Sequence, residues 1–227
     1  MQTQMRCRMG IEMTEKSFLQ IKAYNELKNR ILTGEFQPDT LYSETKISSE
    51  ISISRTPMRE ALQRLSQDGY ISIVPSKGFM IRTLTEKDML ESIQVRCAIE
   101  GYCASILASD SDSRKKKTAL SDLRKCIDQM EQSLYIQDEH TEFIRHDHEF
   151  HMLLVNYAGN EEFNEIFQRL LYMIQLTSKN ALSAEGRPEG TLKEHKALLS
   201  LLESGDAGAA YKAIIEHLMM PLRIYKK

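Results

Sequence analysis

The sequence predicts a mainly α-helical protein of two domains: an N-terminal winged helix-turn-helix with a short β-hairpin wing, and a C-terminal all-α bundle of six helices. Three observations predict this fold class. The chain has 227 residues, more than a typical single domain. Apolar residues recur with helical spacing between residues 17 and 68 and again from residue 86 onward. Between these regions, residues 70–81 read as two strands joined by a turn.

The first domain is expected at residues 17–82, after a tail at residues 1–16. Gly34 ends its first helix, because glycine readily takes the left-handed conformation of a C-cap, and Pro38 prevents the helix from continuing. A turn at 75–78 separates the two predicted strands. The helices are predicted near residues 17–33, 43–51 and 55–68, and the strands at 70–74 and 79–81.

The second domain is expected at residues 86–227, after a linker at 83–85. Thr85 and Asp88 have the spacing of a capping box, which marks the start of its first helix. Every later segment has helical spacing, and glycine-containing breaks at Gly159, Gly186 and Gly205 separate the last four segments. The six helices are predicted near residues 86–109, 112–136, 139–158, 160–184, 188–203 and 206–223.

Charge is distributed unevenly between the two domains. Residues 16–82 carry ten basic and seven acidic side chains, whereas residues 83–227 carry eighteen and twenty-three. A basic N-terminal domain and an acidic C-terminal domain fit a nucleic-acid-binding module joined to a domain with another role. No apolar run approaches the roughly 20 residues that a membrane span needs, and no apolar segment follows Arg6 and Arg8 as in a signal peptide. We therefore expect a cytoplasmic protein that does not enter a membrane.

The helix predicted at 55–68 carries two arginines at its N-terminal end. Arg55 and Arg59 are four residues apart and share one face, and Pro57 falls in the first turn, where a missing N–H costs nothing. Arginine can donate two hydrogen bonds to guanine in the major groove. The alternative from this helix alone is an ordinary amphipathic helix whose arginines are solvated.

The surrounding sequence resembles the signature of the GntR family of DNA-binding regulators over residues 20–82. The resemblance implies base contacts by Arg55, Thr56 and Arg59, backbone contacts by Ser54 and Arg64, and insertion of Lys77 and Gly78 into the minor groove. Two positions depart from the family pattern. Ser52 stands where glycine is usual in a turn, and Thr45 where some members have a DNA-contacting arginine. The matching residues are Gly34 to Pro38, Leu41, Glu44, Ser54 to Pro57, Arg59 to Leu62, Leu65, Gly69 and Lys77-Gly78.

Four side chains of the second domain are candidate metal ligands. Asp147 and His151 are four residues apart on one predicted helix, so their side chains point the same way, while His195 and His217 lie on later helices. One carboxylate and three imidazoles could converge on a divalent cation, although spacing alone does not establish convergence. His148 is turned about 100° away from His151 and is left out of the set.

A second resemblance concerns this region. Residues 147–154 are similar to the D-x-x-F-H-x-x-L motif of the FCD effector domain, found in the FadR-like branch of GntR regulators, and residues 194–199 and 205–218 match its later motifs. The resemblance implies that Asp147, His151, His195 and His217 hold a divalent metal, with zinc as the first choice and nickel or manganese as alternatives. A buried polar cluster without metal is the competing interpretation.

Arg96 completes the expected effector site. The FCD resemblance places it at the same cavity, where its planar guanidinium would bind the carboxylate of a small organic acid. The alternative is a structural salt bridge with Glu100, four residues further on. The predicted function is therefore a homodimeric transcriptional repressor that binds a palindromic operator in double-stranded DNA and responds to a small acid.

Two other functions remain open at this point. A metal-responsive regulator would use the cation itself as its signal, and a metal-dependent hydrolase would use the open metal position for catalysis. The second is disfavoured, because no nucleophile or general-base motif accompanies the ligands and a hydrolase does not need the DNA-reading segment. The count of six helices favours the shorter, VanR-like subgroup of FCD regulators.

Overall fold

The computed structural model describes residues 15–83, 85–111, 113–136 and 140–225. Within them the chain divides into two compact units, one ending at Thr83 and the other following it. The tail predicted at 1–16 lies almost entirely outside the described residues, as does the centre of the linker predicted at 83–85. None of the described helices combines the length and the apolar character that crossing a bilayer requires.

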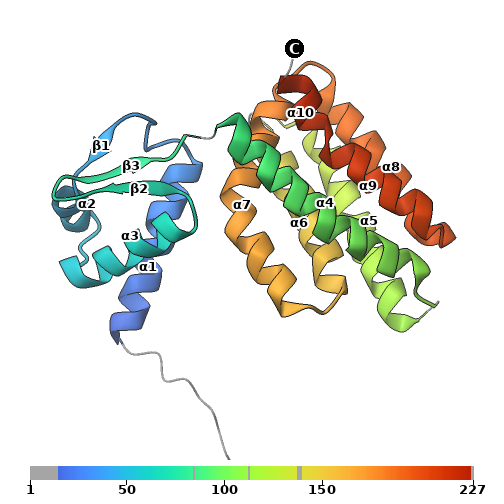
Figure 1. The fold of residues 1–227 in the computed structure, drawn as a ribbon, viewed down its shortest axis with the longest axis horizontal. Coiled ribbons are helices and arrows are strands. Elements are labelled where there is room, and N and C mark those ends of the chain that lie inside the picture. The colour runs from blue at the N-terminus through green and yellow to red at the C-terminus, as the bar shows by residue number, and fades with distance from the viewer. Residues whose placement is uncertain (1–14, 84, 112, 137–139, 226–227) are drawn as a thin grey trace, which may run out of the picture. The chain divides into compact units, whose positions relative to one another are not determined.

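The N-terminal unit is built on two long helices that pack against each other (Figure 1). Helix α1, Glu15–Leu32, crosses and packs against α3, Arg55–Gln67, and the short α2, Glu44–Glu50, packs against α3. The predicted C-cap at Gly34 has the left-handed φ of 77° that the sequence required. Burial of one apolar face on each long helix holds the unit together. The buried side chains include Leu27, Ile31, Met58, Leu62 and Leu65.

A three-stranded antiparallel sheet completes this unit. The predicted hairpin forms from β2, Ile71–Val74, and β3, Gly78–Ile81, and its register places Ile71 opposite Ile81. A third strand that was not predicted, β1, Leu41–Tyr42, pairs with the other side of β3. The rings of Phe36, Tyr42 and Phe79 pack together beneath this sheet, with centroids 4.5 to 5.8 Å apart.

The C-terminal unit is entirely helical. The predicted capping box is present at its start, where the Thr85 hydroxyl accepts from the Asp88 backbone N–H and the Asp88 carboxylate accepts from the Thr85 N–H. The described helices are α4, Glu86–Ser109; α5, Arg114–Ser133; α6, Thr141–Tyr157; α7, Glu161–Leu182; α8, Arg187–Ser204; α9, Ala207–Leu218; and α10, Met220–Tyr225.

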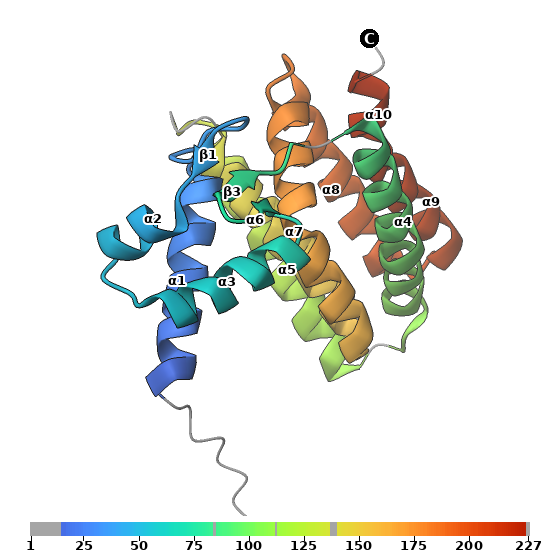
Figure 2. The ribbon, with the colours of Figure 1, turned by 60° about the vertical axis from the view of Figure 1, so that its left-hand side comes forward.

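The first helix of this unit is its centre. Helix α4 packs against α6, α7, α8 and α9, and Figure 2 shows α4, α8 and α9 running side by side. Its apolar residues are distributed around the helix: most are buried against these neighbours, while Leu90, Val95 and Tyr102 are exposed. This arrangement brings α4, α6, α8 and α9 to one region of the bundle, which is where the predicted metal ligands and Arg96 lie.

The predicted number of helices needs one correction. The six predicted segments all form helices, but the last, expected at 206–223, divides into α9 and α10 at Met219. The physical reason is Pro221, which has no N–H to donate and is tolerated only in the first turn of a new helix. The described residues therefore form seven helices in this unit. The VanR-like subgroup was inferred from a count of six helices, so that inference is no longer supported.

Candidate functional site: an exposed arginine pair and a buried histidine cluster

The N-terminal end of α3 presents the arginines singled out in the sequence. Ser54 is the N-cap, although its hydroxyl makes no capping hydrogen bond, and Pro57 is buried in the first turn. Arg55, Thr56 and Arg59 are all exposed. The two guanidinium groups therefore face solvent one helical turn apart, as a groove-binding helix requires.

Arg59 and Arg64 each have a partner within the unit. The Nε atom of Arg59 donates to Glu44 Oε1 on α2 at 2.8 Å, while two thirds of the Arg59 side chain stays exposed. Arg64 lies over the Tyr24 ring at 4.6 Å from its centroid, and its Nε is 3.9 Å from Asp68. Both pairs are solvent-accessible and therefore weak, so they orient the arginines without sequestering them.

The tip of the hairpin carries Lys77 and Gly78. Lys77 is exposed in the turn between β2 and β3. Gly78 has a φ of 140°, and a Cβ atom placed on it would lie 1.9 Å from the backbone oxygen of Tyr42 in β1. The fold itself thus requires glycine at this position, a reason that the sequence did not reveal because β1 was not predicted.

The two departures from the family pattern lie on α2 and in the turn that follows it. Ser52 adopts a φ of 55°, the left-handed conformation that glycine accepts without strain. The usual glycine at this position is therefore explained by the backbone, and serine costs stability there. Thr45 is exposed on α2.

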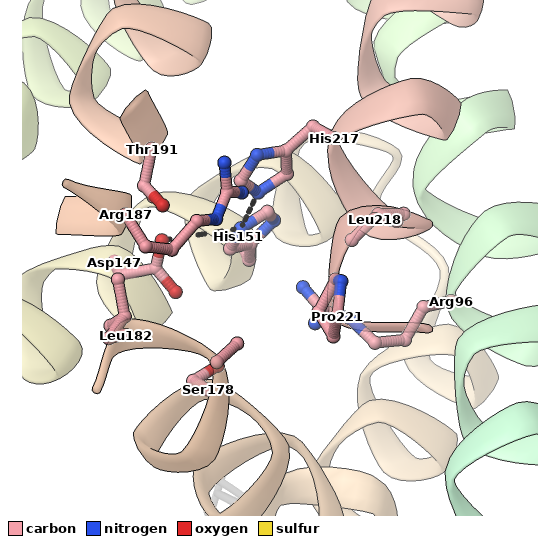
Figure 3. Close-up of a pocket in the computed structure, with 11 residues that line it drawn as sticks. Arg96, Asp147, His151, Ser178, Leu182, Arg187, Thr191, His217, Leu218 and Pro221 are labelled. Carbon is pink, nitrogen blue, oxygen red and sulfur yellow. Dashed lines mark hydrogen bonds and ion pairs between the residues drawn. The ribbon is translucent and has the colours of Figure 1, made fainter. Parts of the chain in front are cut away.

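The four predicted metal ligands converge inside the helical unit, and Figure 3 shows three of them, Asp147, His151 and His217. Asp147 and His151 come from α6, His195 from α8 and His217 from α9, and one donor atom of each lies within 4.8 Å of the other three. The Oδ1 atom of Asp147 is 3.3 Å from His195 Nε2 and 3.8 Å from His151 Nε2. The Nε2 atoms of His151 and His217 are 3.2 Å apart.

The Nδ1 atom of each imidazole, on the side of the ring away from the cluster, lies within hydrogen-bond distance of an oxygen acceptor. His151 Nδ1 lies 2.5 Å from Glu100 Oε2, His195 Nδ1 lies 2.9 Å from the Thr191 carbonyl, and His217 Nδ1 lies 2.7 Å from a carboxylate oxygen of Glu194. A neutral imidazole whose Nδ1 donates has its lone pair on Nε2. All three lone pairs therefore face the centre of the cluster.

A divalent cation fits this arrangement. Asp147 Oδ1 and His195 Nε2 are buried and have no hydrogen-bond partner within the described residues. Unpaired acceptors facing one another at these distances repel unless a cation lies between them. Three imidazoles and one carboxylate, with acceptors behind each ring, are a donor set that zinc and other divalent transition metals take.

The protonation states of the cluster also suit a metal. Burial lowers the pKa of His195 to about 4 and that of His151 well below its usual value, so both rings are neutral near pH 7. Burial opposes ionisation of Asp147, but the surrounding imidazoles outweigh it and bring its pKa to about 2. The site therefore presents neutral nitrogen ligands and an ionised carboxylate at neutral pH.

Arg96 lines the same cavity and also forms the alternative salt bridge. Its Nε donates to Glu100 Oε1 at 2.6 Å, and the two side chains are almost completely buried. Its Nη2 atom has no hydrogen-bond partner within the described residues. Burial raises the pKa of Glu100, and Arg96 counteracts this. The pKa of Glu100 stays above its usual value, while the hydrogen bonds from Arg96 to one oxygen and from His151 Nδ1 to the other favour its ionised form.

The cavity beside the cluster is small. Its free volume is about 30 Å³, room for one or two water molecules. Figure 3 shows Arg96 on one side, and Asp147 with Thr191 on the other. Its polar or charged lining residues within the described part of the chain are Arg96, Asp147, His151, Ser178, Arg187, Thr191 and His217.

Three of the residues at this cavity were missed by the sequence analysis. Arg187 donates to both carboxylate oxygens of Glu194, at 2.6 and 2.8 Å, and Glu194 in turn holds His217. These hydrogen bonds and the Arg187 ion pair bring the pKa of Glu194 to about 2 despite its burial. The hydroxyl of Thr191 is buried without a hydrogen-bond partner in the described chain. Arg187 and Glu194 are seven residues apart on α8, a spacing that puts them on one helix face, whereas the contact of Glu194 with His217 depends on how α8 packs against α9.

His148 lies outside the cluster, as the helix geometry predicted. It is buried, its Nε2 has no hydrogen-bond partner among the residues described, and burial lowers its pKa to about 4. It is absent from the group of donor atoms that converge. It thus provides a buried histidine on the same helix for comparison with His151.

Two family models match the chain, one for each structural unit. The model for bacterial regulatory proteins of the gntR family matches residues 19–81, and the FCD domain model matches residues 91–219. A transcriptional regulator of Bacillus subtilis, YdhC, is 27% identical over 197 residues, covering 87% of this chain and 86% of its own. The repressor GlaR of Escherichia coli is 26% identical over 218 residues, covering 91% and 96%.

Solved structures share the fold. McbR/YncC of Escherichia coli superposes with a TM-score of 0.73 at 19% identity, covering 91% of this chain and 96% of that one. A regulator from Rhodococcus sp. RHA1 gives 0.72 at 22% identity, covering 88% and 93%. The matched families and relatives are transcription regulators, which sets the hydrolase alternative aside. The chain belongs to the GntR family of bacterial transcriptional regulators and carries an FCD domain.

Proposed function

We propose that this regulator represses transcription from a palindromic operator and that a small carboxylic acid, bound at a metal in the helical unit, controls its affinity for DNA. The observation that carries the proposal is the group of four inward-facing donor atoms, each imidazole fixed from behind, beside an arginine with an unpartnered donor. Such a group has no evident role in folding alone, because leaving buried acceptors unpaired costs stability.

DNA recognition is assigned to the exposed end of α3 and to the hairpin. Arg55, Thr56 and Arg59 would contact base edges in the major groove, and Ser54 and Arg64 the phosphates. Lys77 would follow the negative potential of the minor groove, with Gly78 shaping the tip. Because related repressors include GlaR of Escherichia coli and the gluconate operon repressor of Bacillus licheniformis, we assign repression to this chain.

Metal binding is assigned to Asp147, His151, His195 and His217, with zinc as the first candidate and nickel or manganese as alternatives. The metal would supply a Lewis-acid centre with open positions, on which a carboxylate oxygen can bind. Arg96 would donate from Nη2 to the same carboxylate, since its Nε is already committed to Glu100. The cavity in the structure must widen to admit an acid.

Control of DNA binding then follows from linkage. A cytoplasmic homodimer would present two α3 helices to the two halves of an operator. In one arrangement of the dimer the two α3 helices cannot reach both halves of the operator. An acid that binds this arrangement more tightly lowers the affinity of the protein for the operator, and by reciprocity bound DNA lowers its affinity for the acid.

The direct test combines thermal unfolding with DNA binding. The full chain, stripped of metal and then loaded with zinc, would be screened against small organic acids, and the operator would be selected from random duplexes. We expect zinc to raise the melting temperature, and an acid to raise it further and to weaken operator binding. No stabilisation by any acid, with the same outcome for Arg96→Ala, would reject the effector model. If zinc alone switched operator affinity, the metal would be the signal.

A further inference from the structure

Both arginines that line the metal cavity are already neutralised by carboxylates. Arg96 is paired with Glu100, and Arg187 is paired with Glu194 through two hydrogen bonds. The same two glutamates hold the Nδ1 atoms of His151 and His217. Each glutamate therefore orients a metal ligand and cancels the charge of an arginine at the cavity wall.

The charge left for a ligand can be counted from the lining residues. Asp147 is the remaining charged side chain that lines the cavity in the described part of the chain. A divalent cation brings two positive charges and Asp147 cancels one, while the imidazoles are neutral as ligands. One positive charge remains, and a second carboxylate brought into this buried site would stay unpaired, which is costly.

We infer that Glu100 and Glu194 make this site selective for a singly charged carboxylic acid over a dicarboxylic acid. The inference rests on the proposed function and adds the charge class of its ligand. Size acts in the same direction, because the cavity is small and additional carboxylates would have to enter it. The arginines are retained for their directed N–H donors, and their glutamates remove the charge that would admit a second carboxylate.

Propionate and malonate are suitable probes, since both have three carbons and differ by one carboxylate. Binding of each acid to the zinc-loaded full chain would be measured by calorimetry. We expect the wild type to prefer propionate by at least about tenfold. Glu194→Gln keeps an oxygen acceptor for His217 but frees the charge of Arg187, so the preference should move toward malonate by about tenfold. The control is Glu203→Gln on the same helix, whose ion pair with Arg124 is exposed, and it should leave the preference unchanged.

A second variant guards against damage to the metal site. Arg187→Gln lowers the charge of the site by one and should weaken propionate binding about tenfold, with zinc still bound in stoichiometric amount. A wild type that prefers malonate, or an unchanged preference in zinc-loaded Glu194→Gln, would overturn the inference while leaving the proposed function standing. If Glu194→Gln lost its zinc, unchanged propionate binding by Arg187→Gln would overturn it equally. Zinc binding without a response to any acid would reject both.

Discussion

The two units use arginine in opposite ways. On α3, Arg55 and Arg59 are exposed, and the Glu44 partner of Arg59 lies at the surface, where solvent weakens the pair. In the bundle, Arg96 is buried and Arg187 partly buried, and each is paired with a carboxylate that also holds a histidine. The surface keeps its cations available for a polyanion, whereas the pocket neutralises them and leaves only selected N–H donors. The charge of each region thus matches the charge of the ligand assigned to it.

The largest effect is expected from removing a metal ligand. This change tests the metal-binding role assigned to the pocket in the helical unit. His195→Ala should lower zinc affinity by at least about 100-fold, because it deletes a ligand whose ring is already oriented by the Thr191 carbonyl. Competition with a chromogenic chelator measures the affinity. His148→Gln, a change at a buried histidine outside the cluster, should leave zinc affinity within a few-fold of the wild type. Equal losses in the two variants would refute the ligand assignment.

The next effect concerns the exposed arginines. Arg59→Ala should weaken binding to the selected operator by about 1–3 kcal/mol and relax base preference at one position in each half-site. Glu44→Gln should strengthen DNA binding slightly, because it removes a negative charge beside Arg59 while keeping an oxygen acceptor for its Nε. Fluorescence anisotropy with operator and mutated duplexes measures both. Lys125→Ala, an exposed charge in the helical unit, controls for the loss of charge, and an effect as large as that of Arg59→Ala would contradict the assignment.

The buried histidines predict a pH dependence for the metal-free protein. His148 and His195, with pKa values near 4 in the folded state, cannot take up the proton that an unfolded histidine binds below pH 6.5. The unfolded state therefore binds more protons between pH 6.5 and 4, and stability falls as pH falls through that window. Asp147, whose pKa is lowered from 3.8 to about 2, adds a further loss of stability, but only as pH falls below its ordinary pKa of 3.8. We expect a loss of about 2 kcal/mol per histidine at pH 5.

Urea unfolding at pH 7 and pH 5, with chelator present, measures this loss. His148→Gln should recover about one histidine's share, because it removes one of the buried groups. A metal-free protein equally stable at both pH values would show that these rings are not buried as neutral imidazoles.

The smallest effect is expected at the turn before α3. Ser52→Gly should stabilise the protein by about 1 kcal/mol, since glycine accepts the left-handed φ of 55° without the steric penalty of a Cβ atom. Ser49→Gly, within α2, should have the opposite sign and a similar size, because glycine is a poor helix former. Denaturant unfolding measures both. Destabilisation by Ser52→Gly would mean that the serine hydroxyl has a role that the backbone does not reveal.

Much of the architecture could be predicted from local patterns. Gly34, Pro38 and the Thr85–Asp88 capping box act within a few residues of the chain, so the sequence alone locates the helix ends that they set. Strand β1 could not be predicted, because two residues carry no periodicity and form a strand only by pairing with β3. The division at Met219 had a signal in Pro221 that outweighed the helical spacing around it.

The pocket could be predicted only in part. Family resemblance identified Asp147, His151, His195 and His217, and the structure brings them together. The contact of Glu194 with His217 depends on the packing of α8 against α9, which the sequence does not show, whereas Arg187 and Glu194 are two turns apart on the same helix face, a signal that the sequence analysis did not use. Arg96 fits both interpretations given from the sequence, a salt bridge with Glu100 and a donor for a bound carboxylate. Its Nε pairs with Glu100, while its Nη2 has no hydrogen-bond partner within the described residues.

The most direct test of the central claim is the operator affinity of the zinc-loaded protein, measured with and without the acid that most raises its melting temperature. We predict a change of about 5-fold to 150-fold, the usual range of coupling between two sites. The change should disappear in Arg96→Ala and survive in Lys125→Ala. Identical operator affinity with and without a saturating acid would contradict the claim that the helical pocket governs how the exposed arginines meet DNA.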